Sequence, residues 1–356
     1  MNIYVMNTSL QRIGVIDGYR SIIWTQRYYE AGDFELFLDA TQENIDLCQK
    51  GRFLYREGDY EDGVFKSVMI IRYVQLNTSI DEGNTLLVKG PDLKSILGQR
   101  IIWNQTILSG TLENNIRSVI NSNIINPSLS ARKISNFTLG DAMGGTETVQ
   151  VQATGDNIDL WLTEQVTPYE IGYDVQIKNG NFVFILYKGT DRSYDQNAVP
   201  YVIFSPEFEN LLASDYTESD IDMRNLALVA GEGEGSARKV TTAGDASLTG
   251  LQRIELYVDA RDISSTTDSG TLTPAQYTAQ LQSRGLEKLA ELQGLKLFEG
   301  EVEAETNFIY GVDYFLGDKV QVVNEYGIGA SARIVEIIDA EDETGRTVMP
   351  TFSTGG

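Results

Sequence analysis

A stretch rich in aromatic and β-branched residues, positions 21–40, constrains the fold of this chain more than any other segment. It reads SIIWTQRYYEAGDFELFLDA: an apolar run, an interruption at Gly32 and Asp33, and then alternation of apolar and less apolar residues over positions 34–39. Alternation with a period of two is typical of a strand with one buried face. The stretch therefore predicts a β-hairpin whose aromatic residues anchor a barrel or a pair of packed sheets.

Histidine is absent from the 356 residues, and cysteine occurs once, at Cys48. The lack of histidine excludes Ser-His-Asp and Cys-His catalysis and histidine-ligated zinc sites, and it removes the commonest general base near neutral pH. One cysteine cannot form an internal disulfide. Because Cys48 lies among Ile45, Leu47 and Phe53, we expect a small buried residue rather than a nucleophile.

The chain is strongly acidic, with 51 Asp and Glu residues against 28 Lys and Arg residues and a formal net charge of −23. Such a surface repels nucleic acid and anionic lipid. We therefore expect no specific binding of DNA, although an acidic surface could line a channel through which DNA passes. No run of eighteen apolar residues and no secretion-signal pattern is present, so we expect no membrane insertion.

The first part of the chain changes from strand-like to mixed character. Strand patterns continue to about Trp103. Two helical stretches follow, with Thr111 and Asp156 as expected N-caps, and then a hairpin with the turn Asn179-Gly180. This region predicts an α+β module.

Strands resume at about residue 201, and one long helix interrupts them. The pair Thr273-Pro274 is a strong helix start, and we expect the helix to stop at Gly294. Strand patterns return from residue 297 to the end. Two β units of similar size that flank an α+β insertion are compatible with a duplicated barrel, and the length predicts two or three domains.

Four blocks of the sequence resemble a known family. They are RIGVIDGYRSIIWTQRYYEAGDFELFLDA near the start, TPAQYTAQLQSRGLEKLAEL, and the final blocks YGVDYFLGDKVQVV and ARIVEIIDAEDETGRTVMPTF. They resemble siphophage tail-tip hub proteins of the Tal-like family, which are similar to the trimeric baseplate-hub proteins of contractile phages. The resemblance implies a mainly β fold with two tube-protein-like β-barrel domains plus a peripheral α+β domain.

The resemblance also implies a function. Such proteins are trimeric virion components that join a sixfold tail tube to a threefold tip and form a channel for DNA ejection. The implied partners are two further copies of the chain, the distal tail protein, the tape-measure protein and receptor-binding or tip proteins. The implied location is the virion tail tip, after assembly in the bacterial host cytoplasm. We expect no cofactor and no enzymatic activity, because no lytic module follows Phe352.

The expected domain boundaries follow from these patterns. Residues 1–103 form the first β-barrel domain, 104–200 the α+β peripheral domain, 201–235 the first part of the second barrel, 236–296 a second peripheral part with the long helix, 297–352 the second part of the second barrel, and 353–356 a tail.

Five acidic residues are candidates for lining the channel. They lie on polar faces of expected strands: Glu35, Asp39, Glu301, Glu303 and Glu305. The last three alternate with Val302 and Ala304, which predicts one shared face. The alternative for each residue is a face that simply meets bulk water. We expect no catalytic, cofactor-binding or metal-binding residues.

Other acidic and aromatic residues allow alternative functions. Glu232 and Glu234 could form the carboxylate pair of a carbohydrate hydrolase, although a solvated loop is favoured. The group Asp215, Glu218, Asp220 and Asp222 lacks the spacing of a calcium loop. The tryptophans Trp24, Trp103 and Trp161 are expected in the core, although tryptophan also marks interfaces. A carbohydrate-binding adhesion module is the remaining alternative.

Overall fold

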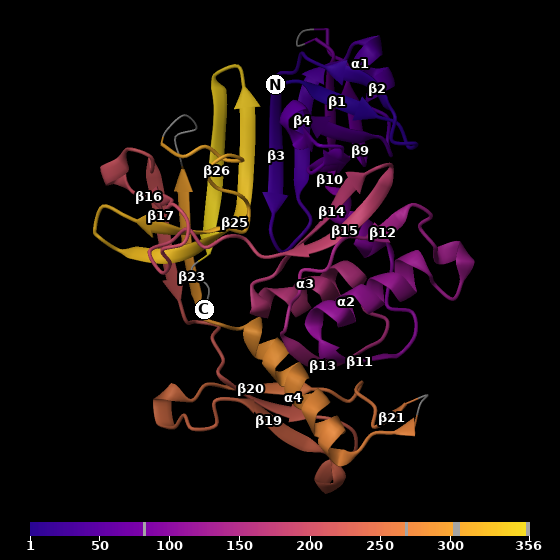
Figure 1. The fold of residues 1–356 in the computed structure, drawn as a ribbon, viewed down its shortest axis with the longest axis vertical. Coiled ribbons are helices and arrows are strands. Elements are labelled where there is room, and N and C mark those ends of the chain that lie inside the picture. Colours follow the sequence, from indigo (N-terminus) through magenta and orange to yellow (C-terminus); the bar gives the residue numbers. More distant parts are fainter. Residues whose placement is uncertain (81–82, 268–269, 302–306, 354–356) are drawn as a thin grey trace.

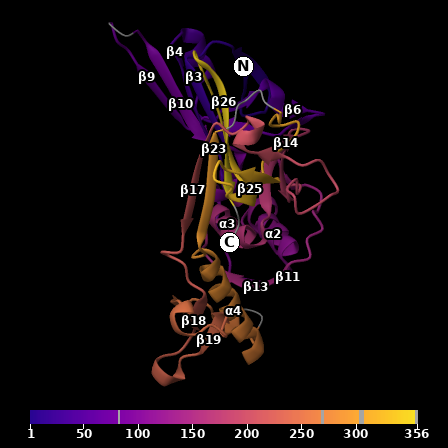
Figure 2. The same ribbon diagram turned by 90° about the vertical axis from the view of Figure 1, so that its left-hand side faces the viewer.

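The computed structural model describes residues 1–80, 83–267, 270–301 and 307–353 of the chain. Two β-rich units lie side by side at one end of an elongated molecule, and an α+β module occupies the middle. A small domain with the long helix α4 (Pro274–Ala290) forms the opposite end (Figures 1 and 2). Strands predominate and helices are few, so the expected mainly β class is confirmed. No helix in the described ranges is both long enough and apolar enough to cross a membrane.

One large sheet joins the two β units. Eight of its ten strands form a continuous path in the order β17 (Ala213–Ser219), β23 (Leu295–Glu301), β26 (Gly345–Ser353), β25 (Gly329–Asp342), β3 (Ser21–Arg27), β4 (Asp33–Asp39), β10 (Thr85–Pro91) and β9 (Tyr73–Asn77). The strands β16 (Ile203–Phe204) and β24 (Lys319–Val323) attach beside the path. The two units meet at the antiparallel pair β25–β3, where Ile338 lies opposite Thr25. Sequence patterns alone indicated two separate β units, whereas in the structure they share one sheet.

The two halves of this path have the same topology. The first half contributes β3, β4, β9 and β10, and the second half contributes β17, β23, β25 and β26. When the four strands of each half are counted along the chain, they lie side by side in the order first, second, fourth and third. Alignment of the strand registers makes the cross-strand pair Trp24 and Phe34 equivalent to Tyr216 and Phe298. The ring centroids of these pairs are 6.0 and 6.1 Å apart. The shared topology and the matched aromatic pairs indicate an internal duplication.

The hairpin β3–β4 forms as the alternation predicts, and its inner face packs on a second sheet. That sheet has the order β2 (Arg12–Ile16), β1 (Ile3–Met6), β5 (Phe53–Arg56) and β8 (Val68–Ile70). Gly32 is required at the turn because a Cβ atom there would lie 2.1 Å from the carbonyl oxygen of Thr25. The short helix α1 (Gln42–Leu47) follows, and Cys48 is buried beside it, where burial raises the pKa of its thiol to about 12. The expectation that Cys48 is buried is confirmed.

Tyr28, at the end of the same hairpin, lies where three parts of the chain meet. Its ring is fully buried, and its hydroxyl lies 3.2 Å from the carbonyl oxygen of Glu170 and 3.1 Å from that of Tyr187, either of which can accept its single hydrogen. Glycine is needed on two sides of the ring, because a Cβ atom would come within 2.1 Å of it at Gly172 and within 2.3 Å at Gly317. The aromatic hairpin therefore anchors both β units and the central module.

The central module contains two ladders of strands and two helices. The main sheet has the order β12 (Phe137–Leu139), β15 (Asn181–Tyr187), β14 (Gly172–Lys178), β7 (Val64–Phe65) and β6 (Tyr60–Glu61), and the second ladder pairs β11 (Thr106–Thr111) with β13 (Thr148–Ala153). The helices are α2 (Leu112–Ile120) and α3 (Ile158–Val166). The turn between β14 and β15 is the predicted Asn179-Gly180, with φ values of 50° and 74°.

One of the two predicted helix caps is corrected by the structure. Thr111 caps α2 as expected, but α3 is capped by Asn157, whose side-chain oxygen accepts from the backbone N–H groups of Asp159 and Leu160. The carboxylate of Asp156 instead accepts from the backbone N–H of Thr154 at 2.9 Å. Both residues are competent caps, and the turn before the helix selects the second.

The distal domain packs α4 on a three-stranded sheet. The sheet has the order β19 (Val240–Gly244), β18 (Leu226–Ala230) and β20 (Glu255–Asp259), and a small hairpin joins β21 (Thr266–Thr267) to β22 (Gly270–Thr271). Thr273 and Gln276 form a capping box at the start of α4, as the Thr-Pro signal predicts. The helix ends at Ala290, before the expected Gly294. Leu281 and Leu289 are buried against the sheet.

Candidate functional site

The face of the ten-stranded sheet that points away from the two cores is the candidate site. In β4 the residues Phe34, Leu36 and Leu38 are buried, so Glu35 and Asp39 lie together on the opposite face. We call this side of the sheet the open face. Its outward-pointing residues include Gln75, Leu87, Lys89, Glu35, Phe37, Asp39, Ile23, Arg27, Glu336, Ile338, Met349 and Thr217. The open face is therefore mixed in character and not uniformly acidic.

Both described channel candidates have a basic partner. Glu35 forms an ion pair with Lys89, which lies directly opposite it on β10. Asp39 forms an ion pair with Arg20, with 2.7 Å between Oδ1 and Nη2. Exposed pairs of this kind contribute little to stability, because water and salt screen the attraction. Their main effect on the open face is to neutralise its charge locally.

The remaining three channel candidates fall at the end of β23. Glu301 is the last residue of that strand, where its backbone lies opposite Ala213 of β17. The side chain of Glu301, and all of Glu303 and Glu305, lie outside the described residues. Their assignment to a channel remains a prediction.

A third charge cluster on the open face lies across the seam between the two β units. Arg27 of β3 donates to Asp33 at 2.6 Å and to Glu336 of β25 at 2.7 Å. Arg27 and Glu336 occupy opposite positions in the β25–β3 pair. The seam is therefore bridged by side chains as well as by backbone hydrogen bonds.

A buried charge network lies beneath the seam, on the inner side of the sheet. Arg56 contacts Asp59 at 2.8 Å and Asp339 at 2.6 Å, and Arg346 contacts the same Asp339 at 2.7 Å. The Arg56 guanidinium also lies over the ring of Trp24, 5.0 Å from its centroid. Sequence analysis missed this network. The sequence did contain one signal for it: Asp339 is an acidic residue at an inward-pointing position of β25, and a buried charge requires a partner of opposite charge.

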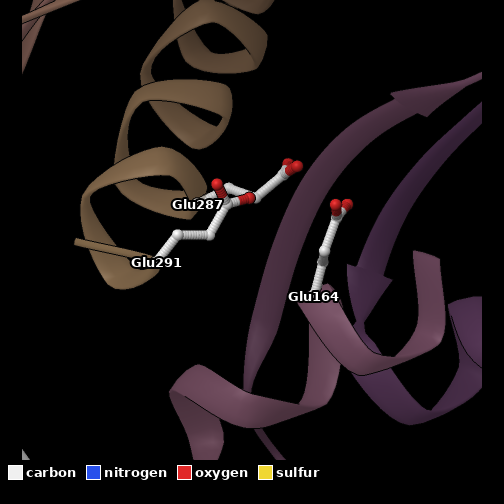
Figure 3. A group of neighbouring side chains, drawn as sticks. All are labelled: Glu164, Glu287 and Glu291. Atoms are coloured by element: carbon white, nitrogen blue, oxygen red, sulfur yellow. The ribbon is translucent and has the colours of Figure 1, made fainter. Parts of the chain in front are cut away.

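A group of carboxylates lies between α3 and α4. Glu164 of α3 faces Glu287 of α4 and Glu291, the C-cap of that helix (Figure 3). One carboxylate oxygen of each residue lies within 4.8 Å of the others. Lys288 lies among them, 3.9 Å from both Glu164 and Glu287, and supplies a positive charge. Burial, opposed by Arg284 and reinforced by Glu164, raises the pKa of Glu287 to about 7. The group lies at the contact between the central module, which contains α3, and the distal domain, which contains α4.

The acidic residues considered for catalysis or calcium binding are placed differently. Glu232 is held in the structure, because its carboxylate accepts from the backbone N–H and the hydroxyl of Ser265; these bonds lower its pKa. Glu232 is partly exposed and Glu234 is exposed, so both lie at the surface, but Ser265 fixes the position of the Glu232 carboxylate. Asp215 and Glu218 point to opposite faces of β17, so the strand does not bring them together.

The predicted burial of the tryptophans is confirmed for two of them. Trp24 and Trp161 are in the core, but Trp103 is 49% exposed. Its indole lies beside the guanidinium of Arg132 at the surface. The expectation of a third core anchor is therefore wrong, because Trp103 follows a single bridge residue, Ile101, and no regular strand holds it inward.

Comparison with known proteins identifies the family. A family model described as Siphovirus ReqiPepy6 Gp37-like protein matches residues 2–353. The chain belongs to this family. No curated protein sequence matches the chain significantly.

Several solved structures share the fold of this Gp37-like chain. The tail protein from Neisseria meningitidis MC58 has 15% identity and a TM-score of 0.58, with 99% of this chain and 95% of that chain covered. The 43 kDa tail protein of prophage MuSo2 from Shewanella oneidensis has 14% identity and a TM-score of 0.56, with coverage of 100% and 99%. The prophage tail protein gp18 from Listeria monocytogenes EGD-e has 12% identity and a TM-score of 0.56, with coverage of 100% and 96%. The fold is thus that of phage tail proteins, and the resemblance to siphophage tail proteins is confirmed.

Proposed function

We propose that this Gp37-like chain is a structural component of a siphophage tail, a trimeric hub at the tail tip that surrounds a channel for DNA ejection. One observation carries the proposal: two topologically equivalent four-stranded sets lie side by side in a single sheet. Three copies of the chain would bring together six such sets. Six equivalent sets on a threefold axis would join a sixfold tail tube to a threefold tip.

The outer edges of the sheet support closure into a ring. Within the described chain, β9 pairs only with β10 and β17 pairs only with β23. Unpaired edge strands are ready templates for pairing with another chain. The duplication makes β9 equivalent to β25 and β17 equivalent to β3, and β25 and β3 already pair within the chain. Head-to-tail pairing of β9 with β17 of the next copy would repeat that junction and close the ring.

The equivalence also gives a register for the proposed contact. Gln75 corresponds to Ile338, and Thr217 corresponds to Thr25. Since Ile338 lies opposite Thr25, Gln75 should lie opposite Thr217 of the next copy. Both side chains are exposed on the open face of a single chain.

In this arrangement the open face lines the channel. Three cations on it, Arg20, Arg27 and Lys89, are each paired with carboxylates. DNA is held by free cations through counterion release, so a face without them leaves DNA mobile. The proposed neighbours are the distal tail protein, the tape-measure protein and tip or receptor-binding proteins. We propose a structural role without enzymatic activity and without a cofactor.

Oligomeric state and cross-linking test the proposal. Light scattering of the purified chain should give the mass of a trimer. The variant Gln75→Cys, Thr217→Cys should form disulfide-linked species up to three chains and no larger. The matched control, Gln75→Cys with Thr242→Cys on the distal domain, should not cross-link. A monomer that persists at high concentration, together with no cross-linking, would overturn the proposal.

A further inference from the structure

A basic surface pocket on the central module is not explained by the proposed hub. It has a volume of about 410 Å³ and lies between the end of the 3₁₀ helix η2 (Leu93–Gln99) and the 3₁₀ turn η4 (Ser130–Arg132). Arg100, Trp103 and Arg132 line it. These residues are outside the ten-stranded sheet, so the pocket does not depend on closure of the ring.

The two arginines of the pocket are held in place by neutral groups. Arg132 donates to the carbonyl oxygen of Ile101 at 2.6 Å and to Oδ1 of the buried Asn123 at 3.3 Å. Arg100 donates through Nε to the carbonyl oxygen of Arg132 at 2.8 Å. Asn123 also accepts from the backbone N–H of Trp103, which ties the two walls of the pocket together. The guanidinium groups are therefore positioned before any ligand arrives.

The side-chain hydrogen bonds that the structure shows for the two arginines all go to neutral acceptors, namely the carbonyl oxygens of Gln99, Ile101 and Arg132 and Oδ1 of Asn123. This is notable in a chain with 51 acidic and 28 basic residues. The burial of Arg132 and the neighbouring positive charge of Arg100 lower the pKa of Arg132. An anion between the two guanidinium groups would relieve this repulsion, and a carboxylate fits the planar fork of arginine.

The rim of the pocket is apolar. Trp103 is 49% exposed, Leu129 is 50% exposed and Ile101 is 38% exposed. The Arg132 guanidinium lies 4.7 Å from the centroid of the Trp103 ring. Exposed tryptophan and arginine beside aliphatic residues are typical of the energetic centre of a protein interface. The ligand should therefore carry apolar groups next to its anion.

The side chains around the pocket favour a protein ligand over a glycan. Sugar hydroxyls need acceptors as well as donors, and among the side chains lining this pocket only the uncharged Gln99 and Ser130 can accept, whereas two arginines donate. We propose that the pocket docks an acidic segment of a partner protein, with a carboxylate between Arg100 and Arg132 and an adjacent aliphatic side chain against Trp103. Charge complementarity with the uncompensated arginines identifies the occupant.

Tryptophan fluorescence gives a direct measurement, because Trp103 is exposed whereas Trp24 and Trp161 are buried. The probe is the blocked peptide acetyl-Leu-Asp-Asp-Leu-amide, and the control probe replaces both aspartates with asparagine. We expect a saturable change in fluorescence with the acidic peptide, weakened by salt, and none with the asparagine peptide.

Paired variants locate the effect. The double variant Arg100→Gln, Arg132→Gln should bind the acidic peptide at least tenfold more weakly. The matched control is Arg12→Gln, which removes an arginine that lies over the ring of Tyr4, 3.9 Å from its centroid, on another surface. Equal binding by the double variant and the wild type would overturn the proposal, as would the absence of a saturable signal.

Two further measurements keep the proposal testable if the double variant does not fold. In the wild type, iodide should quench Trp103 at least as well as neutral acrylamide, despite the net charge of −23. Weak iodide quenching would show that the pocket does not attract anions and would overturn the proposal. Glucuronate should compete poorly with the peptide; saturable binding of glucuronate without binding of the peptide would replace the protein partner with a glycan and also overturn it.

Discussion

Arg56 and Asp339 form a buried ion pair, with 2.6 Å between Nη1 and Oδ2, although 283 positions separate them in the chain. The pair lies beneath the junction of β25 with β3, where the two duplicated halves meet. Asp339 is 1% exposed and also accepts from Arg346. The two β units are thus joined into one sheet both by the backbone pairing of β25 with β3 and by buried ion pairs beneath it.

Removal of this buried carboxylate should destabilise the protein strongly. Asp339→Ala leaves the buried Arg56 without one of its two anionic partners, and such a loss costs about 3–5 kcal/mol. Urea unfolding measures the change in the free energy of unfolding. The control Asp39→Ala removes an exposed pair with Arg20 and should cost less than about 1 kcal/mol. Equal, small effects of the two variants would show that the buried pair does not stabilise the junction.

The contact between α3 and α4 should become less stable as the pH rises. The pKa of Glu287 is raised to about 7 in the folded chain from an ordinary value of 4.5. Between these values the folded state keeps a proton that the unfolded state has lost, so the free energy of unfolding decreases as the pH rises through this window. Glu287→Gln should remove this dependence and stabilise the protein at pH 8 by at most about 3 kcal/mol, the equivalent of this shift.

Urea unfolding at pH 5 and pH 8 measures the effect of Glu287→Gln. The exposed Glu234→Gln is the matched control and should keep the pH dependence of the wild type. If Glu287→Gln and the wild type lose stability equally between the two pH values, the protonation of Glu287 does not cause the pH dependence of stability.

Positive charge in the proposed channel should slow DNA. The substitutions Glu301→Lys, Glu303→Lys and Glu305→Lys would add cations that hold phosphate groups by counterion release. In a phage that still assembles, we expect slower ejection with a steeper salt dependence. Lysine at Glu234, Asp245 and Glu255 of the distal domain is the control for net charge. Normal ejection kinetics with the channel variant would remove these residues from the path.

Purified protein should not cleave cell-wall glycans. The chain contains no histidine. In the structure, the carboxylate of Glu232 accepts a hydrogen bond from the hydroxyl of Ser265, and the carboxylate of Glu287 lies 3.9 Å from the ammonium group of Lys288. A zymogram on purified cell wall should show no cleared band. A band that persists through further purification and disappears with Glu287→Gln would assign an activity to the α3–α4 carboxylates.

Local features of the fold could be predicted from the sequence. The alternation over residues 34–39 identified the buried face of β4, and the Asn179-Gly180 pair identified a hairpin turn. Thr111 and Thr273 identified the starts of α2 and α4. These predictions are correct because the side-chain period and the local backbone conformation are determined by residues only a few positions apart. For the same reason, the shared face of Glu35 and Asp39 was predictable, and their partners Lys89 and Arg20 were not.

The tertiary structure alone decided which distant segments pair. Periodicity shows that a strand has a buried face, but it carries no information about the neighbour that completes the sheet. The seam between β25 and β3, the equivalence of Trp24 with Tyr216, and the burial of Asp339 therefore emerged only in the folded chain. The exposure of Trp103 has the same origin, since its hydrophobicity predicts burial and only the arrangement of the surrounding chain leaves it at the surface beside Arg132.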